Sequence, residues 1–399
     1  MVTNVLVSPA ILALPEFVEN PYPIYDKLRF KGPIIKGMAF KQPGWYVTGY
    51  EEAVMILKDN RFENRIPLPQ TTKRFEELKN VQDNMMLFKN DLDHRRLRLL
   101  IGPFFTPDAL QDLRLYIENT AHELLDQVYG QKRMDIIIDF AFPLASLVIA
   151  RIIGIPPEER YQFRDWAIDL IASIDFTRSR KTLFNGNETM KKLMNYFKCL
   201  IQKRKEVPEN DFISQLLIAE QGEKISDEEI LSACILLVIA GHETTVNLIS
   251  NSILALLKNR EQLQLLKQNP GLMESAVEEF LRYESPTQMV ARVAKEDVHI
   301  HDVCIKKGEQ VYVLIGAANR DPATFTNPHA LDITRNPNPH LAFGSGSHFC
   351  IGAMLAKLEA QLALLPLIHR LENLQLETEY PKWRNLIGFR ALHELIVTW

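Results

Sequence analysis

The sequence predicts a mainly α-helical protein with a small β-rich subdomain, and three observations support this fold class. From about residue 107 to 267, apolar side chains recur at three- and four-residue spacing, which is the pattern of amphipathic helices. Strand signals are short, and the clearest are 44–48 and 310–315, each bounded by turn residues. The stretch 319–339 contains four prolines and four asparagines, so we expect an ordered series of turns there.

The composition is that of one ordinary globular unit. The 399 residues are 46% hydrophobic and 24% charged, and 46 basic against 50 acidic residues give a net charge of −4. This balance gives no reason to expect a nucleic-acid partner. The chain shows no internal repeat and no Gly/Ser linker, so we expect a single domain over residues 1–399.

The sequence predicts a cytoplasmic protein with no membrane anchor. Residues 1–17 have no basic segment and contain two prolines, so they do not resemble a signal peptide. The longest apolar run, 233–241, is about half of what a bilayer span requires. None of the four cysteines forms a C-x-x-C pair, which fits a reducing compartment.

A long central helix is expected, and its middle breaks local rules. Ser226 and Glu229 form a capping box, and the apolar pattern continues to about Lys258. Residues 235–240 are apolar on every side, which predicts burial all round. Gly241 to Thr245 (G-H-E-T-T) then follow, and a mid-helix glycine and a buried carboxylate are both costly.

Such violations together indicate a site. The alternative is a glycine that admits a neighbouring helix and a glutamate that reaches the surface. Zinc is not expected, because His242-Glu243 would begin H-E-x-x-H but position 246 is valine.

The second unusual segment is a cysteine loop, residues 343–352 (F-G-S-G-S-H-F-C-I-G). Two glycines precede Cys350, and we expect a helix to begin at Ile351, whose N-terminus would lower the thiol pKa. Gly352 removes a side chain beside the sulfur, so a flat group could approach. No histidine is evident as a base for a nucleophilic cysteine, whereas a thiolate is a good ligand for iron. The other cysteines are expected to be small buried side chains: Cys199, Cys234 and Cys304.

The loop Phe343-Gly344-x-Gly346-x-His348-x-Cys350-x-Gly352 resembles the haem-binding signature of the cytochrome P450 monooxygenases. Other motifs of that family follow in the right order, and the resemblance covers essentially the whole chain. Ala240-Gly241-x-Glu243-Thr244-Thr245 resembles the oxygen-activation motif, Glu279-x-x-Arg282 with Arg335 resembles the structural triad, and His94, Arg98, Arg292 and His348 match haem-propionate ligands. Leu331 departs from the pattern, because the family often has phenylalanine there.

The resemblance implies the family's helical prism, with haem b as cofactor, dioxygen as co-substrate and Cys350 as the iron ligand. Thr244 would supply a hydrogen bond during oxygen activation, Glu243 would relay protons, and Gly241 would leave room for dioxygen. Taken alone, Glu279 and Arg282 also fit a surface ion pair, and His94 and Arg98 fit a solvated basic segment. A haem-thiolate sensor or an inactive relative is the non-enzyme alternative, and the retained Glu243 and Thr244 argue against it.

Electrons would come from a separate ferredoxin or flavodoxin with its NAD(P)H reductase. We expect that partner to dock beside Cys350, where Arg95, Arg96 and Lys357 could supply positive charge.

The expected substrate is hydrophobic, because the positions matching the family's pocket are mainly apolar. They include Ala240, Gly241, Met289, Val290 and Phe389, together with the segment after Phe62 and the region 165–200.

The stretches 43–50, 175–180 and 283–289 are similar to a family member that cleaves fatty-acyl chains on acyl carrier protein in biotin (pimeloyl) synthesis. Related members hydroxylate macrolides and other polyketides. Hydroxylation is the first expectation and fatty-acyl C–C cleavage the second. Three arginines could bind a fatty acid's carboxylate but are more simply surface residues: Arg65, Arg178 and Arg180.

Overall fold

The computed structural model describes residues 8–64, 73–159, 162–222 and 224–399, and it divides into two compact units. The first unit comprises residues 1–65, 250–350 and 378–395. The second comprises residues 66–249, 351–377 and 396–399. The single domain expected over residues 1–399 stays a prediction.

The first unit contains a five-stranded sheet in the order β1-β2-β8-β5-β3. Its strands are β1 (Ile34–Ala39), β2 (Gln42–Val47), β8 (Gln310–Leu314), β5 (Met289–Ala294) and β3 (Phe62–Glu63). A separate hairpin joins β6 (Val298–Ile300) to β7 (Val303–Ile305). The two strands that the sequence predicts most clearly are β2 and β8, and they pair in parallel, with Trp45 opposite Val311.

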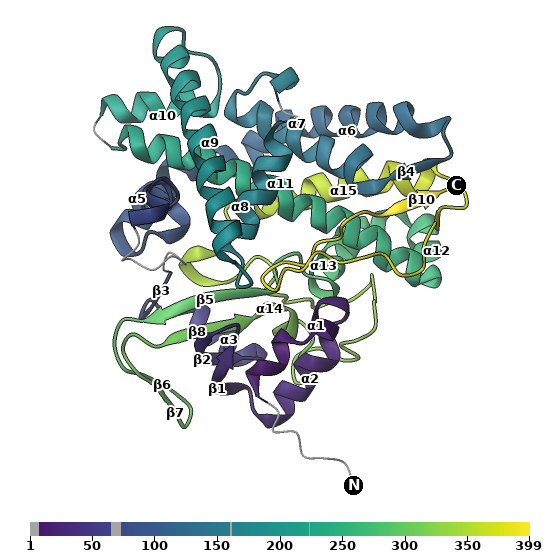
Figure 1. The fold of residues 1–399 in the computed structure, drawn as a ribbon. Coiled ribbons are helices and arrows are strands. Elements are labelled where there is room, and N and C mark those ends of the chain that lie inside the picture. The colour runs from purple at the N-terminus through teal and green to yellow at the C-terminus, as the bar shows by residue number, and fades with distance from the viewer. Residues whose placement is uncertain (1–7, 65–72, 160–161, 223) are drawn as a thin grey trace. The chain divides into compact units, whose positions relative to one another are not determined.

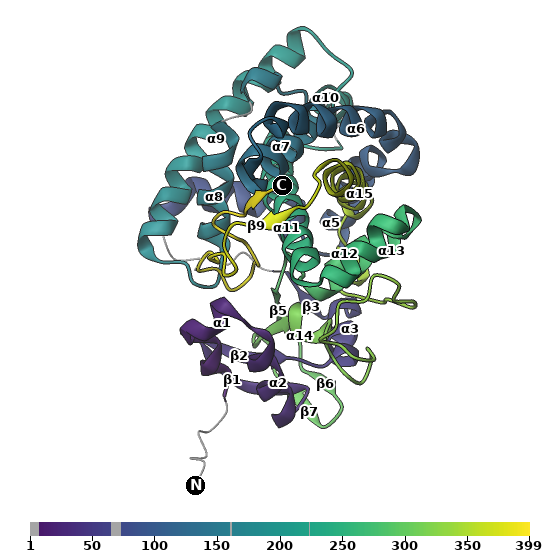
Figure 2. The ribbon, with the colours of Figure 1, turned by 90° about the vertical axis from the view of Figure 1, so that its right-hand side faces the viewer.

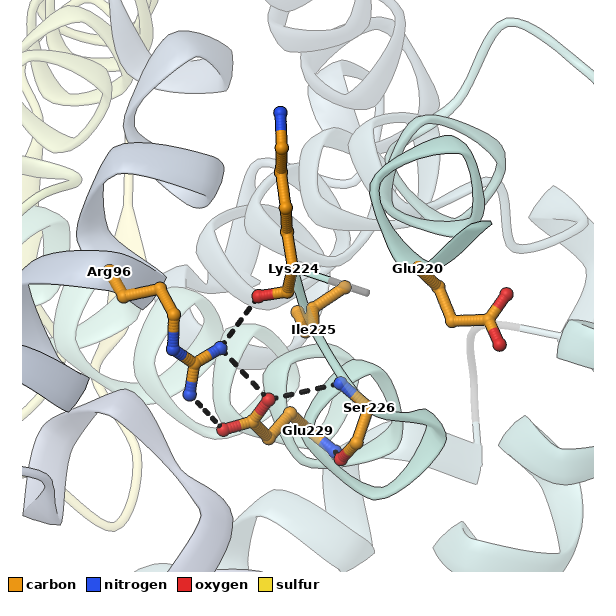
Figure 3. Close-up of a pocket in the computed structure, with 6 residues that line it drawn as sticks. All are labelled: Arg96, Glu220, Lys224, Ile225, Ser226 and Glu229. Atoms are coloured by element: carbon orange, nitrogen blue, oxygen red, sulfur yellow. Dashed lines mark hydrogen bonds and ion pairs between the residues drawn. The ribbon is translucent and has the colours of Figure 1, made fainter. Parts of the chain in front are cut away.

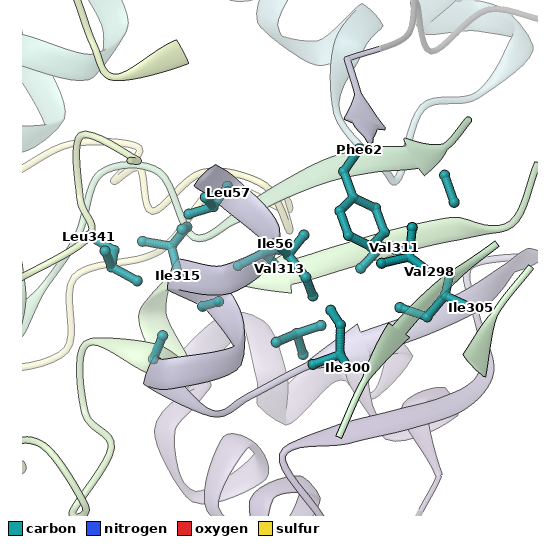
Figure 4. Packing of buried hydrophobic residues seen from close by; sticks show 14 residues of the cluster. Ile56, Leu57, Phe62, Val298, Ile300, Ile305, Val311, Val313, Ile315 and Leu341 are labelled. Carbon is teal, nitrogen blue, oxygen red and sulfur yellow. The ribbon is translucent and has the colours of Figure 1, made fainter. Parts of the chain in front are cut away.

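Helix α3 (Tyr50–Lys58) shares a core with this sheet (Figure 4). Ile56 and Leu57 of α3 lie in one buried apolar cluster with β-strand side chains such as Val311 and Val313. The unit's other helices are α1 (Pro15–Glu19), α2 (Tyr22–Lys31), α12 (Arg260–Gln268), α13 (Met273–Tyr283) and α14 (Ile315–Ala318). The cluster matters for function because Leu341, close to the cysteine loop, belongs to it.

The second unit is mainly helical. Its helices are α4 (Glu76–Asn84), α5 (Asp91–Ile101), α6 (Pro107–Tyr129), α7 (Phe142–Ile153), α8 (Gln162–Ile174), α9 (Arg180–Glu206), α10 (Phe212–Gln221) and α15 (Ala353–Arg370). Helices α6 and α15 pack against each other, as do α8 and α9 (Figures 1 and 2). A three-stranded sheet in the order β4-β10-β9 joins Arg133–Asp135, Ile396–Thr398 and Gln375–Leu376.

Helix α11 (Asp227–Lys258) has 32 residues, about 48 Å at 1.5 Å per residue, and passes from the second unit into the first after Ile249. The predicted capping box is present: Ser226 N–H donates to Glu229 Oε2 over 3.0 Å, and Glu229 N–H donates to Ser226 Oγ over 3.2 Å. The helix ends at Lys258, as the apolar pattern predicts.

Two helical stretches are long and apolar enough to cross a membrane by length and composition, Ile136–Ile153 and Asp227–Lys258. The most apolar 18-residue window of each stretch is 72% and 78% buried within the protein, respectively. This is weak evidence for a membrane span, since a buried core helix has the same length and hydropathy. The expected absence of a membrane anchor stays a prediction.

The turn-rich segment and the last helix largely follow the sequence. Residues 319–345, all of them described, form turns and bends without helix or strand. Helix α15 begins at Ala353, with Gly352 as its N-cap. The expected start at Ile351 is therefore wrong by two residues, because Ile351 and Gly352 form a turn between the cysteine and the helix.

Candidate functional site

The middle of α11 is open on one side only. Side chains from Cys234 to Ile239 are buried, whereas Ala240 is exposed and Gly241 and Thr244 are partly exposed. Thr244 Oγ1 donates a 2.6 Å hydrogen bond to the carbonyl oxygen of Ala240. Ala240, Gly241 and Thr244 lie at i, i+1 and i+4, so they share a face of the helix. A hydroxyl group therefore occupies the open side of an otherwise apolar helix centre.

The two ionisable residues between them are buried. The Nδ1 atom of His242 lies 2.6 Å from the carbonyl oxygen of Val238, so Nδ1 carries the proton. Burial lowers the pKa of His242 to about 4, and this hydrogen bond offsets the lowering only in part. The imidazole is therefore neutral at neutral pH. Glu243 is 9% exposed, so the alternative in which it reaches the surface is wrong.

Gly241 has a packing reason of its own. A Cβ atom at this position would lie 2.3 Å from Cδ1 of Ile149 on α7, a distance that real Cβ atoms do not reach. The alternative in which the glycine admits a neighbouring helix therefore holds. The room for dioxygen expected at Gly241 stays a prediction.

Helix α5 places His94 and Arg98 one turn apart. His94 is buried and Arg98 half-buried. Burial, and to a lesser extent the positive charge of Arg98, lower the pKa of His94. The alternative of a wholly solvated segment is thus wrong for His94, while Arg95 between them is exposed.

The expectation that Arg96 offers its charge to a partner is corrected. Its guanidinium binds both carboxylate oxygens of Glu229, at 2.6 and 3.1 Å, and the carbonyl oxygen of Lys224 at 2.7 Å (Figure 3). These groups line a pocket at the start of α11. Arg96 therefore neutralises the capping glutamate of the long helix, a contact that its place among neighbouring arginines does not reveal.

Backbone contacts hold the cysteine loop. Gly344 and Gly346 both have φ of +73°, a conformation that favours glycine, and a Cβ on Gly346 would lie 2.5 Å from the carbonyl oxygen of Leu57. Cys350 N–H donates to the carbonyl oxygen of Phe343 over 2.9 Å, and Cys350 is exposed. A Cβ on Gly352 would meet no described atom within 4 Å. The loop thus presents a thiol with open space beside it.

Arg292 and His348 belong to the same unit as this loop. Arg292 is 7% exposed and donates to the carbonyl oxygen of Ala291 over 2.9 Å. No carboxylate of the described residues forms an ion pair with it, and burial lowers its pKa to about 10. His348 Nδ1 lies 3.0 Å from the side-chain amide nitrogen of Asn64, so Nδ1 accepts and Nε2 carries the proton of the neutral ring. Both side chains suit an anionic ligand.

Glu279, Arg282 and Arg335 come together around one carboxylate. Arg282 Nε and Nη2 each lie 2.7 Å from a Glu279 oxygen, and Arg335 Nε lies 3.1 Å from Oε2. The Glu279 and Arg282 side chains are 0% exposed. The surface ion-pair alternative is therefore wrong.

Three of the five predicted pocket residues lie near one another in the first unit. Met289 is buried and Val290 half-buried at the start of β5. Thr287 forms an isolated β-bridge with Phe389, and Gln288 N–H donates to Gly388 over 2.8 Å. Ala240 and Gly241 lie in the other unit.

Of the three candidate carboxylate-binding arginines, Arg180 is exposed and Arg178 is half-buried, donating to the carbonyl oxygen of Asp175 over 3.3 Å. Arg65 lies outside the described residues, as does the segment directly after it.

Comparison with known proteins identifies the family. The sequence model described as Cytochrome P450 matches residues 6–270 and 268–386. The chain belongs to the cytochrome P450 family. It is 58% identical over 383 residues to the biotin biosynthesis cytochrome P450 of Bacillus subtilis, covering 96% of this chain and 97% of that protein.

Two further similarities agree. The chain is 38% identical over 397 residues to the polyketide biosynthesis cytochrome P450 PksS of Bacillus subtilis, covering 96% of each. Its structure is similar to P450BioI, solved in complex with hexadec-9Z-enoic acid ligated acyl carrier protein. That TM-score is 0.94 at 58% identity, covering 96% of this chain and 99% of that chain.

As a cytochrome P450, the protein is an oxidoreductase that uses haem b and dioxygen and needs a redox partner for electrons. The predicted fold class, enzyme class and cofactors are thereby confirmed, and the sensor alternative is not supported. The side chains fit haem. An exposed thiol stands beside open space at Gly352, and Arg292 is a buried cation with no carboxylate partner in the described parts of the chain. Within the described residues no group of three or more metal-binding side chains forms.

Proposed function

We propose that this cytochrome P450 oxidises a long fatty-acyl chain carried on acyl carrier protein. The observation that carries the proposal is the likeness to P450BioI, which was solved with such a ligated carrier protein. Hydroxylation is the first candidate reaction, and C–C cleavage as in biotin (pimeloyl) synthesis is the second. A polyketide- or macrolide-like substrate is the second candidate substrate, favoured by the identity to PksS.

Five residues would hold the haem. Cys350 would bind the iron as thiolate, while His94, Arg98, Arg292 and His348 would bind the propionates. The buried Arg292 guanidinium supports this, since an uncompensated buried cation is costly until an anion arrives. When bound, the haem supplies the iron at which dioxygen is activated.

Two residues of α11 would handle protons. Thr244 holds its hydroxyl hydrogen against the Ala240 carbonyl oxygen, which leaves Oγ1 free to accept a hydrogen bond on the open face of the helix. Glu243 would relay protons from water towards that face. Thr244→Ala should keep consuming NADPH while product formation falls by roughly tenfold or more, and Thr244→Ser should restore product. If NADPH consumption and product formation fell equally in Thr244→Ala, this role would be contradicted.

The remaining predicted residues have supporting roles. Met289, Val290 and Phe389, with Ala240 and Gly241, would line an apolar substrate pocket. Glu279, Arg282 and Arg335 would fix the turns that precede the cysteine loop, as their shared carboxylate supports. We also propose that residues 1–399 act as one domain.

The electron donor would be a ferredoxin or flavodoxin with its NAD(P)H reductase, in the cytoplasm and without a membrane anchor. Arg95 is exposed and Lys357 half-buried in the same unit, and both could attract an acidic partner. Arg95→Glu should slow reduction by the cognate partner and weaken its salt dependence. Unchanged rates would remove Arg95 from the docking surface.

The deciding experiment is the absorption spectrum of the reduced, CO-treated protein, followed by substrate titration. A strongly red-shifted Soret band that disappears in Cys350→His supports the thiolate assignment, and a band that survives overturns it. Spin-state titration would then compare acyl carrier protein loaded with a C16 chain, the free fatty acid and a macrolide. A response to the macrolide alone would reject the fatty-acyl proposal.

A further inference from the structure

One asparagine side chain joins the cysteine loop to the buried ion pair of α13. Asn319, which directly follows α14, is 0% exposed. Its Oδ1 accepts the Leu341 N–H over 2.7 Å, and its Nδ2 donates to Ser285 Oγ over 2.8 Å. Its backbone carbonyl oxygen accepts from Arg282 Nη1 over 3.0 Å. The Leu341 N–H can only donate, so the amide oxygen of Asn319, and not its amide nitrogen, must face it.

The same side chain controls where the cysteine loop starts. Leu341 is buried, and its carbonyl oxygen accepts the Gly344 N–H over 2.8 Å. The carbonyl oxygen of Phe343, two residues after Leu341, accepts the Cys350 N–H over 2.9 Å. The orientation of the peptide groups from 341 to 344 therefore decides where the acceptor for Cys350 lies.

The other end of the connection is rigid. Arg282 uses all five of its N–H groups, two on Glu279 and three on the carbonyl oxygens of Asn319, Pro328 and Ala330. Ser285 Oγ in turn donates to the carbonyl oxygen of Leu281 over 2.6 Å. Asn319 is thus anchored on the α13 side by Arg282 and Ser285 and has one group left for the loop.

We infer that Asn319 is a positioning residue for Cys350: its amide oxygen fixes the Leu341 peptide and, through Phe343, the backbone that presents the thiol. The inference rests on the proposed role of Cys350 as haem ligand. Buried polar groups that lose their only partner are costly, so without this oxygen the loop should open more often around the cysteine.

Two substitutions at one position test it. Asn319→Ala removes the acceptor for Leu341, whereas Asn319→Asp keeps an oxygen there. In Asn319→Ala, amide hydrogen exchange at Gly344 and Cys350 should speed up by roughly tenfold. In the reduced, CO-treated enzyme, the absorbance of the red-shifted band should fall by a similar factor relative to the band of haem iron that has no thiolate ligand. Asn319→Asp should restore both readouts in part, because its buried carboxylate still accepts the Leu341 N–H but has lost the amide donor to Ser285 Oγ.

The inference would be overturned if amide hydrogen exchange at Gly344 and Cys350 were unchanged in Asn319→Ala. It would also be overturned if these amides exchanged as fast in Asn319→Asp as in Asn319→Ala. If Asn319→Ala does not fold, Ser285→Ala carries the test, since it removes the Nδ2 partner and leaves the Leu341 bond. Ser285→Ala should then speed up hydrogen exchange at Gly344 and Cys350 by a smaller factor, and an unchanged exchange rate would also overturn the inference. A red-shifted band that survives in Cys350→His would instead reject the proposed ligand, while hydrogen exchange would still report on the loop.

Discussion

Arg282 and Glu279 form a two-point ion pair in which both contacts measure 2.7 Å and neither side chain is exposed to solvent. Such a pair is stable only when every remaining polar atom is satisfied. Glu279 meets this condition with three further donors: Arg335 Nε, Asn338 Nδ2 and the Asp332 N–H. The pair therefore organises the turns of 319–339, which have no regular secondary structure of their own.

Removing one partner of this pair should be severely destabilising. Arg282→Leu leaves the Glu279 carboxylate buried and three backbone carbonyl groups without their donor. We expect the free energy of unfolding to fall by about 3–5 kcal/mol, measured by urea denaturation. Arg133→Ala is the matched control, because Arg133 and Glu377 form an exposed pair with a contact of 2.7 Å. It should change stability by less than about 1 kcal/mol, and similar losses in both variants would contradict the argument.

The contact between Arg96 and Glu229 should matter for stability and for its pH dependence. Burial pushes the pKa of Glu229 upward, but hydrogen bonds from Arg96 and from the Ser226 N–H outweigh it, so the pKa is lowered from 4.5. The ionised pair therefore stabilises the fold above about pH 4.5, and this contribution is lost as the pH falls through the lowered pKa.

Arg96→Ala should reduce stability at pH 7 by about 1 kcal/mol, a modest figure because Arg96 is partly solvated. Thermal unfolding at pH 7 and at pH 3.5 checks this. The stability difference between Arg96→Ala and the parent protein should be smaller at pH 3.5 than at pH 7. An equal difference at both values would mean that Arg96 acts without Glu229. Arg95→Ala, on an exposed neighbour, is the control.

His242 should make stability fall on mild acidification. Its folded-state pKa is lowered to about 4, while an unfolded chain has a value near 6.5. Between these values the unfolded state binds more protons, so stability rises with pH over that range, by up to about 3 kcal/mol in total. In His242→Phe the slope of unfolding free energy against pH should become shallower between pH 4 and 6.5. His299→Gln, at an exposed position, should leave the slope unchanged.

The sequence predicts what depends on local pattern. The capping box at Ser226, the end of α11 at Lys258 and the two strands at 44–48 and 310–315 all follow from periodicity and turn residues, whereas the pairing of those strands does not. The buried state of Glu243 follows from the apolar residues around it.

Contacts between segments that are distant in the sequence could not be predicted from local pattern. Nothing near Gly241 in the sequence indicates Ile149, which lies 92 positions earlier and fills the space that a side chain would need. Asn319 begins a segment rich in asparagine and proline, where its residue type indicates a turn former; only the fold reveals the bonds to Leu341 and Ser285. The position of Arg96 beside the exposed Arg95 likewise conceals that it binds Glu229.

Two glycines of the cysteine loop should respond to alanine in different ways. Gly346 has φ of +73°, and an added Cβ would lie 2.5 Å from the Leu57 carbonyl oxygen, so Gly346→Ala should strain the loop itself. We expect the unfolding free energy of the haem-free protein to fall by about 1–3 kcal/mol, and haem binding to weaken with it.

Gly352 has φ of −88°, and a Cβ there would meet no described atom within 4 Å. Gly352→Ala should therefore leave the stability of the haem-free protein unchanged within about 0.5 kcal/mol. Because the proposal places the haem beside Cys350, the added methyl group should nevertheless weaken haem binding. Haem titration and urea denaturation of both variants separate the two effects. If Gly352→Ala binds haem as tightly as the parent protein, the cofactor does not pass close to this residue, and the proposed approach to the thiol is wrong.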